Sequence, residues 1–445
     1  MNEWFEAERH IERAHEHYEA GRWDDAATEL REALARDPSR AEWHFNLALT
    51  LEAAGRYEDA IRALNDANTL QPGDPTTLLL LGVNALRVDN PRAAATYLDA
   101  ASKADPERPD PLVHLIEANT RLKDHDRAEI AFYQSVQLDP DNPAAFANIA
   151  ESLIDRARYE RAAYCLEQAI RLDPTQPRLH ARLAAVRAEL HQFDRARDLY
   201  LRELRDAPGD IETLLDLGCL LARMGRAAEA SEKLRRALEL DPDCAEAHFR
   251  LAELALDQQR PSDAAESLRA VLRVDPNFPG ARRHLARIAL DARDIPAARR
   301  PLRAELQNFR RLPKPYETHE LIDLADLLLS ARLPSDAAEV AGVIVDRDPH
   351  SADAWHLLAV CLFTLGKHAP GIDAERRALR LDPMRLPALH NMALACIHAG
   401  EWSRAGRLIN HAQRIDPDDE SLRRLRLTLR LRQAIAACRW LLGRR

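Results

Sequence analysis

Residues 41–72 read AEWHFNLALTLEAAGRYEDAIRALNDANTLQP, and this stretch predicts a pair of helices. The apolar stripe of the first helix consists of Phe45, Leu47, Ala48 and Leu51. Gly55 and Arg56 interrupt that pattern, and a second stripe follows at Ala60, Leu64 and Ala67. Pro72 ends the pair, because proline cannot continue a helix and disfavours helix in the residue before it.

This pair is one repeat of an array that fills most of the chain. Eight prolines lie 34 residues apart, at Pro38, Pro72, Pro106, Pro140, Pro174, Pro208, Pro242 and Pro276. A gap of 73 residues leads to Pro349, and the spacing of 34 returns at Pro383 and Pro417, so the gap holds one further repeat with a five-residue insertion. Twelve repeats result, beginning at Ala7, Ala41, Pro75, Pro109, Pro143, Pro177, Ile211, Ala245, Pro279, Thr318, Ala352 and Leu386.

Small residues at two fixed positions indicate that the repeats stack closely. Position 20 is Ala in eleven repeats and Gly371 in the other, while position 8 is Ala or Gly everywhere except at Ile116. A single surface helix does not need so strict a limit on size. A stack in which each repeat covers the apolar face of its neighbour does need it.

These residues resemble the tetratricopeptide repeat family. The family's order of a bulky residue, Leu, a small residue, a second small residue and Pro is present as Trp355, Leu358, Ala359, Gly371 and Pro383. The resemblance covers roughly residues 7–419. It implies an all-α fold, an α-solenoid in which antiparallel helix pairs form a right-handed superhelix. It also implies that the first helices line a concave groove for peptides or partner helices, and it implies no chemistry.

The same resemblance places positions 2, 5, 9, 12 and 13 of each repeat in the groove. Acidic residues are expected along its middle, at Glu117, Glu151, Asp155, Glu189, Glu253 and Asp257, relieved by arginines such as Arg223. Apolar or aromatic residues are expected at its ends, at Phe45, Leu49 and Leu79 and at His356, Phe363 and His390. A partner with basic residues would suit the middle, although acidic residues are also common on any solvated helix face.

Composition agrees with a thin helical array. Glycine accounts for only 14 of 445 residues, aromatic residues make up 5% and charged residues 30%. The formal net charge of −9 gives no reason to expect nucleic acid as a partner. Six dispersed cysteines without a CxxC motif, a start without a secretory signal and no apolar stretch long enough to span a membrane predict a cytoplasmic protein. Five lysines among 63 basic residues suggest a bacterial source.

No pattern of an enzyme is present. The chain has no GxGxxG, GxxxxGK[ST], GxSxG or HExxH motif, and the helix-pair register leaves no long loop for a catalytic site. His390 and His398 lie eight residues apart, about 12 Å along one helix, which is too far for a shared ion. We therefore expect no catalytic residue, no metal and no cofactor.

The regular pattern fails in the ninth repeat. Pro301 lies inside its second helix, where it should kink the helix, and Arg310 replaces the terminal proline. The segment that follows, residues 311–317, reads as a turn or short extended segment, which either changes the superhelical path there or is tolerated without consequence. The expected organisation is a lead-in at 1–6, nine repeats at 7–312, an insertion and candidate hinge at 313–317, three repeats at 318–419 and a basic C-terminal capping helix at 420–445.

The last segment differs from the rest in charge. Residues 420–445 carry eight arginines and one glutamate, a net charge of +7 in an acidic protein. One apolar face of the expected helix, with Leu422, Leu425 and Leu429, can cap the twelfth repeat, whereas another contains Leu427, Leu431 and Leu441. This second face is explained by a frayed cap, by self-association into a homo-oligomer, or by contact with a partner or an anionic surface.

The sequence thus predicts a non-catalytic scaffold or adaptor that binds a protein or peptide in the concave groove. Two alternatives remain at this point. The chain could be a structural protein that assembles with itself through the C-terminal helix, or it could be the regulatory subunit of a separately encoded enzyme.

Overall fold

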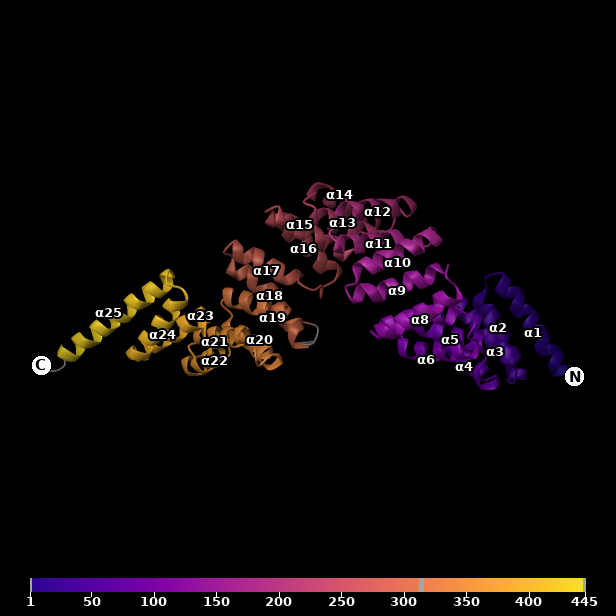
Figure 1. Ribbon diagram of the computed structural model, residues 1–445, viewed down its shortest axis with the longest axis horizontal. Helices are drawn as coiled ribbons and strands as arrows, with labels where there is room; N and C mark the ends of the chain where they lie inside the picture. The colour runs from indigo at the N-terminus through magenta and orange to yellow at the C-terminus, as the bar shows by residue number, and fades with distance from the viewer. Residues whose placement is uncertain (1, 312–315, 443–445) are drawn as a thin grey trace. The chain divides into compact units, whose positions relative to one another are not determined.

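The chain is an array of helices in every part that the structure describes (Figure 1). The computed structural model describes residues 2–311 and 316–442, with side chains within 4–311 and 316–436. No strand occurs in these ranges. The helices are α1 (Asn2–Glu19), α2 (Trp23–Arg36), α3 (Ala41–Ala53), α4 (Tyr57–Leu70), α5 (Pro75–Arg87), α6 (Pro91–Ala104), α7 (Asp110–Arg121), α8 (His125–Leu138), α9 (Pro143–Asp155), α10 (Tyr159–Leu172), α11 (Leu179–Glu189), α12 (Phe193–Asp206), α13 (Ile211–Arg223), α14 (Ala227–Leu240), α15 (Ala245–Asp257), α16 (Pro261–Val274), α17 (Ala281–Asp291), α18 (Ile295–Arg311), α19 (Thr318–Ser330), α20 (Pro334–Arg347), α21 (Ala352–Thr364), α22 (His368–Leu381), α23 (Leu386–His398), α24 (Trp402–Ile415) and α25 (Glu420–Leu442).

The predicted repeat register is confirmed at most helix starts. Eight of the odd-numbered helices, the first helices of their repeats, begin at the predicted residue: α3, α5, α9, α13, α15, α19, α21 and α23. Helix α7 begins one residue late, and α11 and α17 begin two residues late. Arg178 and Gly280, with φ of 64° and 79°, immediately precede the two latest helices, because a left-handed residue cannot belong to the helix. Residues 2–6 form the start of α1.

The small residues hold the two helices of a repeat together as expected. All eleven alanines at position 20 are completely buried. At position 8, a Cβ added to Gly218 would lie 2.9 Å from Leu234 of the second helix, closer than real contacts of this kind. The two helices of a repeat therefore approach closely at these positions, and at Gly218 they leave no room for a Cβ without a shift of Leu234.

The ninth repeat departs from the pattern at its second helix. The second helices of the other repeats are 14 residues long, whereas α18 has 17 residues and continues through Pro301. Arg310 stands where the other repeats have the helix-ending proline, so α18 runs on to Arg311. Arg311, expected in a turn, is therefore helical. The rest of the predicted insertion lies outside the described residues, except Tyr316 and Glu317.

The chain divides into two compact units, an N-terminal unit (Met1–Arg236) and a C-terminal unit (Ala237–Arg445). In the N-terminal unit one apolar cluster extends from Ala7 to Val186. In the C-terminal unit a second cluster extends from Ala286 to Cys361. Each cluster runs across several repeats, as in a stack whose neighbours share one core, and the fold is an all-α solenoid.

Candidate functional site

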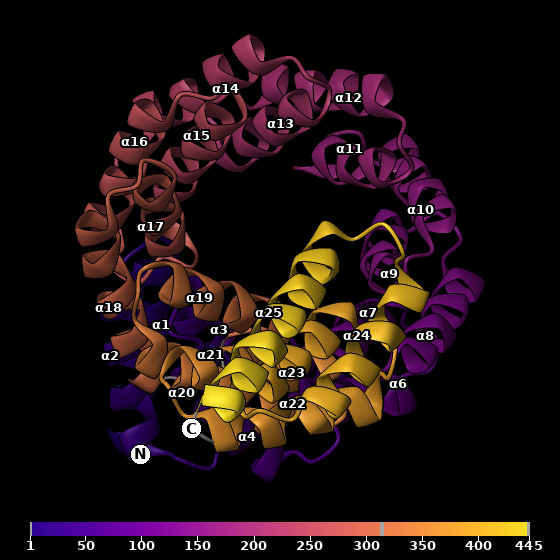
Figure 2. The ribbon, with the colours of Figure 1, turned by 90° about the vertical axis from the view of Figure 1, so that its left-hand side faces the viewer.

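The first helices of the N-terminal unit form a surface that crosses several repeats. In Figure 2, α9, α11 and α13 follow the inner side of the bend in this unit, and α10 and α12 follow its outer side. A cavity of about 260 Å³ opens among these helices. Its lining includes Ile154 of α9, Glu189 of α11 and both Asp216 and Arg223 of α13. A partner lying here would contact three successive repeats at once.

The acidic residues predicted along the groove are neutralised by basic neighbours. The shortest N–O distances are 2.6 Å for Glu117 with Arg121, 2.7 Å for Glu151 with Arg182, 2.7 Å for Asp155 with Lys123, 3.4 Å for Glu189 with Arg223 and 2.9 Å for Glu253 with Arg250. Three of these pairs join neighbouring repeats. Because the partners are partly in solvent, each pair contributes below about 1 kcal/mol to stability. The first helices thus present both signs of charge, and Asp257 of α15 is exposed.

The predicted apolar residues at the start of the array have different environments. Leu49 lines a cavity of about 530 Å³ among α1, α2 and α3, together with Ile11, Ala14, Tyr18 and Leu30. Phe45 is half-buried. Leu79 is only 7% exposed and belongs to the core of the N-terminal unit, so it offers a partner little surface.

The predicted groove residues near the end of the array make contacts within the protein itself. His356 Nδ1 lies 3.0 Å from Oε1 of Glu375, a carboxyl group that is fully buried. Burial raises the pKa of Glu375, although the hydrogen bond with His356 opposes this change. Phe363 is half-buried over Gly371, where a side chain would collide with its ring. His390 lines a separate cavity of about 440 Å³ together with residues of α25.

The C-terminal helix has the two faces predicted from its sequence. Leu422, Leu425 and Leu429 are buried, the latter two against α23 and α24. Leu427, Leu431 and Ile435 are 58%, 56% and 50% exposed. The side chain of Leu441 lies outside the described residues. Helix α25 therefore caps the last repeat with one face and leaves an apolar stripe on the other.

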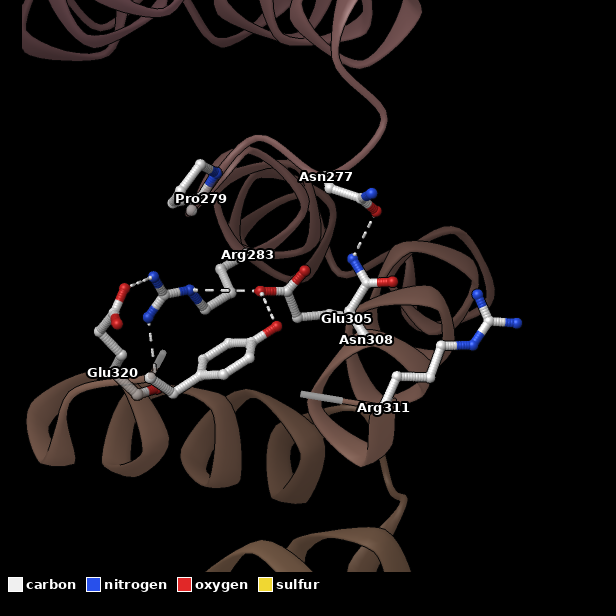
Figure 3. Close-up of a pocket in the computed structure, with 9 residues that line it drawn as sticks. Asn277, Pro279, Arg283, Glu305, Asn308, Arg311 and Glu320 are labelled. Carbon is white, nitrogen blue, oxygen red and sulfur yellow. Dashed lines mark hydrogen bonds and ion pairs between the residues drawn. The ribbon is translucent and has the colours of Figure 1, made fainter. Parts of the chain in front are cut away.

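A further cavity lies where α17, α18 and α19 meet, within the C-terminal unit (Figure 3). It has a volume of about 320 Å³ and is lined by charged and amide side chains. Arg283 lies between Glu320 and Glu305, and it donates to the backbone oxygen and the carboxylate of Glu320. Asn308 Nδ2 donates to Asn277 Oδ1 at 3.0 Å on another side of the cavity.

Several charged side chains of this cavity are buried, so the ionisation of each depends on the groups beside it. The Glu305 side chain is 4% exposed, lies 3.5 Å from Arg282 and accepts a 3.2 Å hydrogen bond from the Tyr316 hydroxyl. Burial, together with the Glu305 carboxylate, raises the pKa of Tyr316, so its hydroxyl remains a donor. Burial also opposes ionisation of Glu320, but the Glu317 backbone amide and Arg283 outweigh it and lower the pKa of Glu320. The arrangement is a tightly paired cluster rather than a set of reactive groups.

Sequence reasoning missed this cluster, although the repeat alignment carries a signal for it. Glu305 occupies position 27 of its repeat, where seven repeats have alanine. Glu203 occupies position 27 of the sixth repeat, and there it accepts a 2.8 Å hydrogen bond from the backbone amide of Arg178. A glutamate at position 27 therefore accompanies both of the first helices that start two residues late, α11 and α17.

The described residues contain neither a membrane-spanning helix nor a metal-binding cluster. Among them, no helix combines the length and apolar character needed to cross a bilayer. Across 2–311 and 316–442, no three His, Cys, Asp or Glu side chains gather as the ligands of a metal ion would. The candidate sites consist of apolar, amide and paired charged side chains.

Several solved structures are similar to parts of this chain. A tetratricopeptide repeat protein from Parabacteroides merdae is 15% identical, with 56% of this chain and 98% of that chain covered and a TM-score of 0.45. Pseudomonas aeruginosa pilF is 20% identical over 46% of this chain and 92% of its own, with a TM-score of 0.41. YrrB, described as a TPR protein with an unusual peptide-binding site, is 21% identical over 45% and 99%, with a TM-score of 0.36. No curated protein matches the sequence.

The repeats themselves match a family model. The model, described as tetratricopeptide repeat, matches residues 11–75, 79–143, 148–211, 215–266, 250–313 and 322–384. These segments cover most of the chain and follow the helix pairs of the structure. The chain belongs to the tetratricopeptide repeat family.

Proposed function

We propose that this protein is a non-catalytic scaffold that binds an extended segment of a partner protein along its first helices. Members of the family generally serve as protein–protein interaction scaffolds. The observation that carries the proposal is the cavity shared by α9, α11 and α13, because it gives a partner one continuous surface across three repeats. Many small contacts along a preformed surface would provide the affinity.

The proposed partner segment carries basic residues among apolar ones. Its lysines or arginines would take the places of Lys123 and Arg182 beside Asp155 and Glu151. At Lys123 this exchange costs little, since exposed ion pairs contribute little to stability. Arg182 would in addition give up its hydrogen bond to the backbone oxygen of Ala147. The displaced basic side chains can then reach solvent, and the partner's apolar residues can enter the cavity near Ile154.

We place this activity in a reducing cytoplasm. Burial raises the pKa of the Cys165 thiol to about 11 and that of Cys361 to about 12. Both thiols therefore stay protonated and pack as small apolar groups in the core.

Crosslinked affinity purification from native lysate tests the scaffold proposal. The intact chain is compared with a variant carrying Glu151→Lys, Asp155→Lys, Glu253→Lys and Asp257→Lys, and recovered proteins are quantified by mass spectrometry. We expect a partner that the intact chain captures and the variant loses. The matched control, Lys123→Met with Arg182→Met, frees the carboxylates and should retain or enrich that partner. Equal recovery by the intact chain and the acidic-residue variant would contradict the proposal.

A further inference from the structure

The exposed stripe of α25 has the form of a docking surface. Leu427, Leu431 and Ile435 follow one another at intervals of four residues, so they form a line about 12 Å long on one side of the helix. The opposite side already covers the last repeat through Leu425 and Leu429. The stripe therefore remains free after α25 has capped the array.

The charges beside this stripe indicate the kind of surface that it fits. Arg430 and Arg432 flank the stripe, are exposed and form no ion pair with any described residue. Between Glu420 and Leu442 the helix has six arginines and one glutamate. Pairing two copies of α25 would bring arginine against arginine. An acidic acceptor with an apolar centre is electrostatically favoured.

Helix α1 and its neighbours form such an acceptor. The cavity of about 530 Å³ beside α1 has Ile11, Glu12, Tyr18 and Leu49 in its lining. Glu8 lies one turn before Glu12, and neither glutamate forms an ion pair with any described residue. In total α1 carries six glutamates and two arginines.

We propose that α25 of one copy docks into the cavity beside α1 of a second copy, and that the chain assembles head to tail. Leu427, Leu431 and Ile435 enter the apolar lining, while Arg430 and Arg432 pair with Glu8 and Glu12. Donor and acceptor are different surfaces, so the contact is heterologous and produces open chains or closed rings rather than a two-fold dimer. The inference rests on the proposed function in one respect, because the cavity is the first end of the same groove. The middle of the groove remains free for another protein.

Mass photometry and sedimentation velocity of the full chain test this contact. We expect the mean mass to rise between about 0.1 μM and about 100 μM protein, and to fall when salt is raised from about 0.05 M to about 0.5 M, because screening weakens the charge pairs. The tail variant carries Leu427→Glu and Leu431→Glu, and the acceptor variant carries Glu8→Arg and Glu12→Arg. Each should weaken association about tenfold or more. Leu138→Glu, at an exposed leucine of α8, is the matched control and should associate as the intact chain does.

Mixing the two variants identifies the geometry. The tail variant keeps an intact acceptor and the acceptor variant keeps an intact tail, so the mixture should give a one-to-one dimer and nothing larger. Circular dichroism of each variant establishes that it is folded. A chain that stays monomeric throughout, an acceptor variant that associates normally, or a mixture without dimers would overturn the proposal.

Two controls distinguish head-to-tail docking from a membrane contact and from partner binding in the groove. The intact chain should not co-sediment with vesicles of phosphatidylcholine and phosphatidylserine. If the intact chain co-sediments with them and the tail variant does not, α25 is a membrane contact and head-to-tail docking is wrong. The variant with Glu151→Lys and Asp155→Lys should still assemble. If it assembles while neither it nor the intact chain captures any partner from lysate, head-to-tail docking stands and the scaffold proposal alone fails.

Discussion

Ion pairs between regular repeats and ion pairs in the cluster around Glu305 differ in how far their side chains are exposed. In the pair of Lys123 with Asp155 the side chains are 67% and 32% exposed, whereas those of Arg283 and Glu305 are 10% and 4% exposed. An exposed pair exchanges readily with solvent or with a partner. A buried pair cannot lose one member without leaving an uncompensated charge. The burial of an ion pair, rather than the number of ion pairs in a region, should therefore determine how much that region is destabilised when one charged side chain is removed.

The largest expected effect is at Glu305. Glu305→Ala removes the carboxylate that faces Arg282, whose side chain is 13% exposed, and it should destabilise the junction by about 3–5 kcal/mol. Arg283 keeps Glu320 as a partner in this variant. Native-state hydrogen exchange of α17, α18 and α19 measures this local change, since a repeat array need not unfold in one step. Asp155→Ala, which breaks an exposed pair, is the control and should change protection by below about 1 kcal/mol. Equal losses of exchange protection in the two variants would show that buried and exposed ion pairs contribute equally to stability in this protein.

A smaller effect is expected at Tyr316. Tyr316→Phe deletes the hydroxyl that donates to Glu305 and should cost about 1.5–3 kcal/mol, because the acceptor is charged. The ring keeps its edge contact with Phe309, at 5.8 Å between centroids. Hydrogen exchange of α18 and α19 again provides the measurement. Tyr316→Ala should cost more; unchanged protection in the Phe variant would show that the hydroxyl contributes nothing.

The dependence on pH should have opposite signs in two places. The pKa of Glu320 is lowered, so its contribution to stability is present above the ordinary value near 4.5 and is lost as pH falls. The pKa of Glu375 in α22 is raised by burial, so its contribution is present below 4.5 and is lost as pH rises through the raised value. Exchange protection, corrected for the intrinsic rate at each pH, should therefore fall with acidification at α19 and with alkalinisation at α22. Glu320→Gln and Glu375→Gln should each flatten only their own profile.

The smallest effect is expected for Glu189 and Arg223, which lie 3.4 Å apart and are about half exposed. A double-mutant cycle with Glu189→Ala and Arg223→Ala should give a coupling below about 1 kcal/mol. The single substitution at Arg223 can cost more, since its guanidinium also lies over the Phe193 ring. A coupling energy of about 3–5 kcal/mol, the size expected for loss of the buried Glu305 carboxylate, would mean that side-chain exposure does not explain why ion pairs in the two regions differ in their contribution to stability.

Much of the fold was predictable because one pattern recurs twelve times. The period set by the prolines placed eight first helices at their observed starts, and the small residues at position 20 correctly indicated close contact. The late starts of α11 and α17 were missed. Each late start follows a residue with positive φ, Arg178 or Gly280. Arginine adopts this conformation uncommonly, so its presence did not predict the late start of α11.

The helix that carries each candidate groove residue was predictable from the sequence, but the ion-pair partner of that residue was not. The sequence placed Asp155 and Glu189 on first helices, but it did not reveal that Lys123 and Arg223 lie beside them from neighbouring repeats. Such pairs depend on side-chain conformations across a helix interface, which periodicity does not specify. The junction cavity was harder still to predict, because α17, α18 and α19 contribute to it and one of its residues, Tyr316, belongs to the insertion.

The constant spacing of the prolines has a consequence for how this protein can change in length. Each regular repeat offers its neighbour the same kind of surface that it receives from the one before, so deletion or duplication of a whole repeat leaves compatible surfaces in contact. A gene could thus lengthen or shorten the surface formed by the first helices in steps of 34 residues without redesigning the core. An insertion of a few residues instead requires a new junction, with an extended helix and buried charges, as in the ninth repeat.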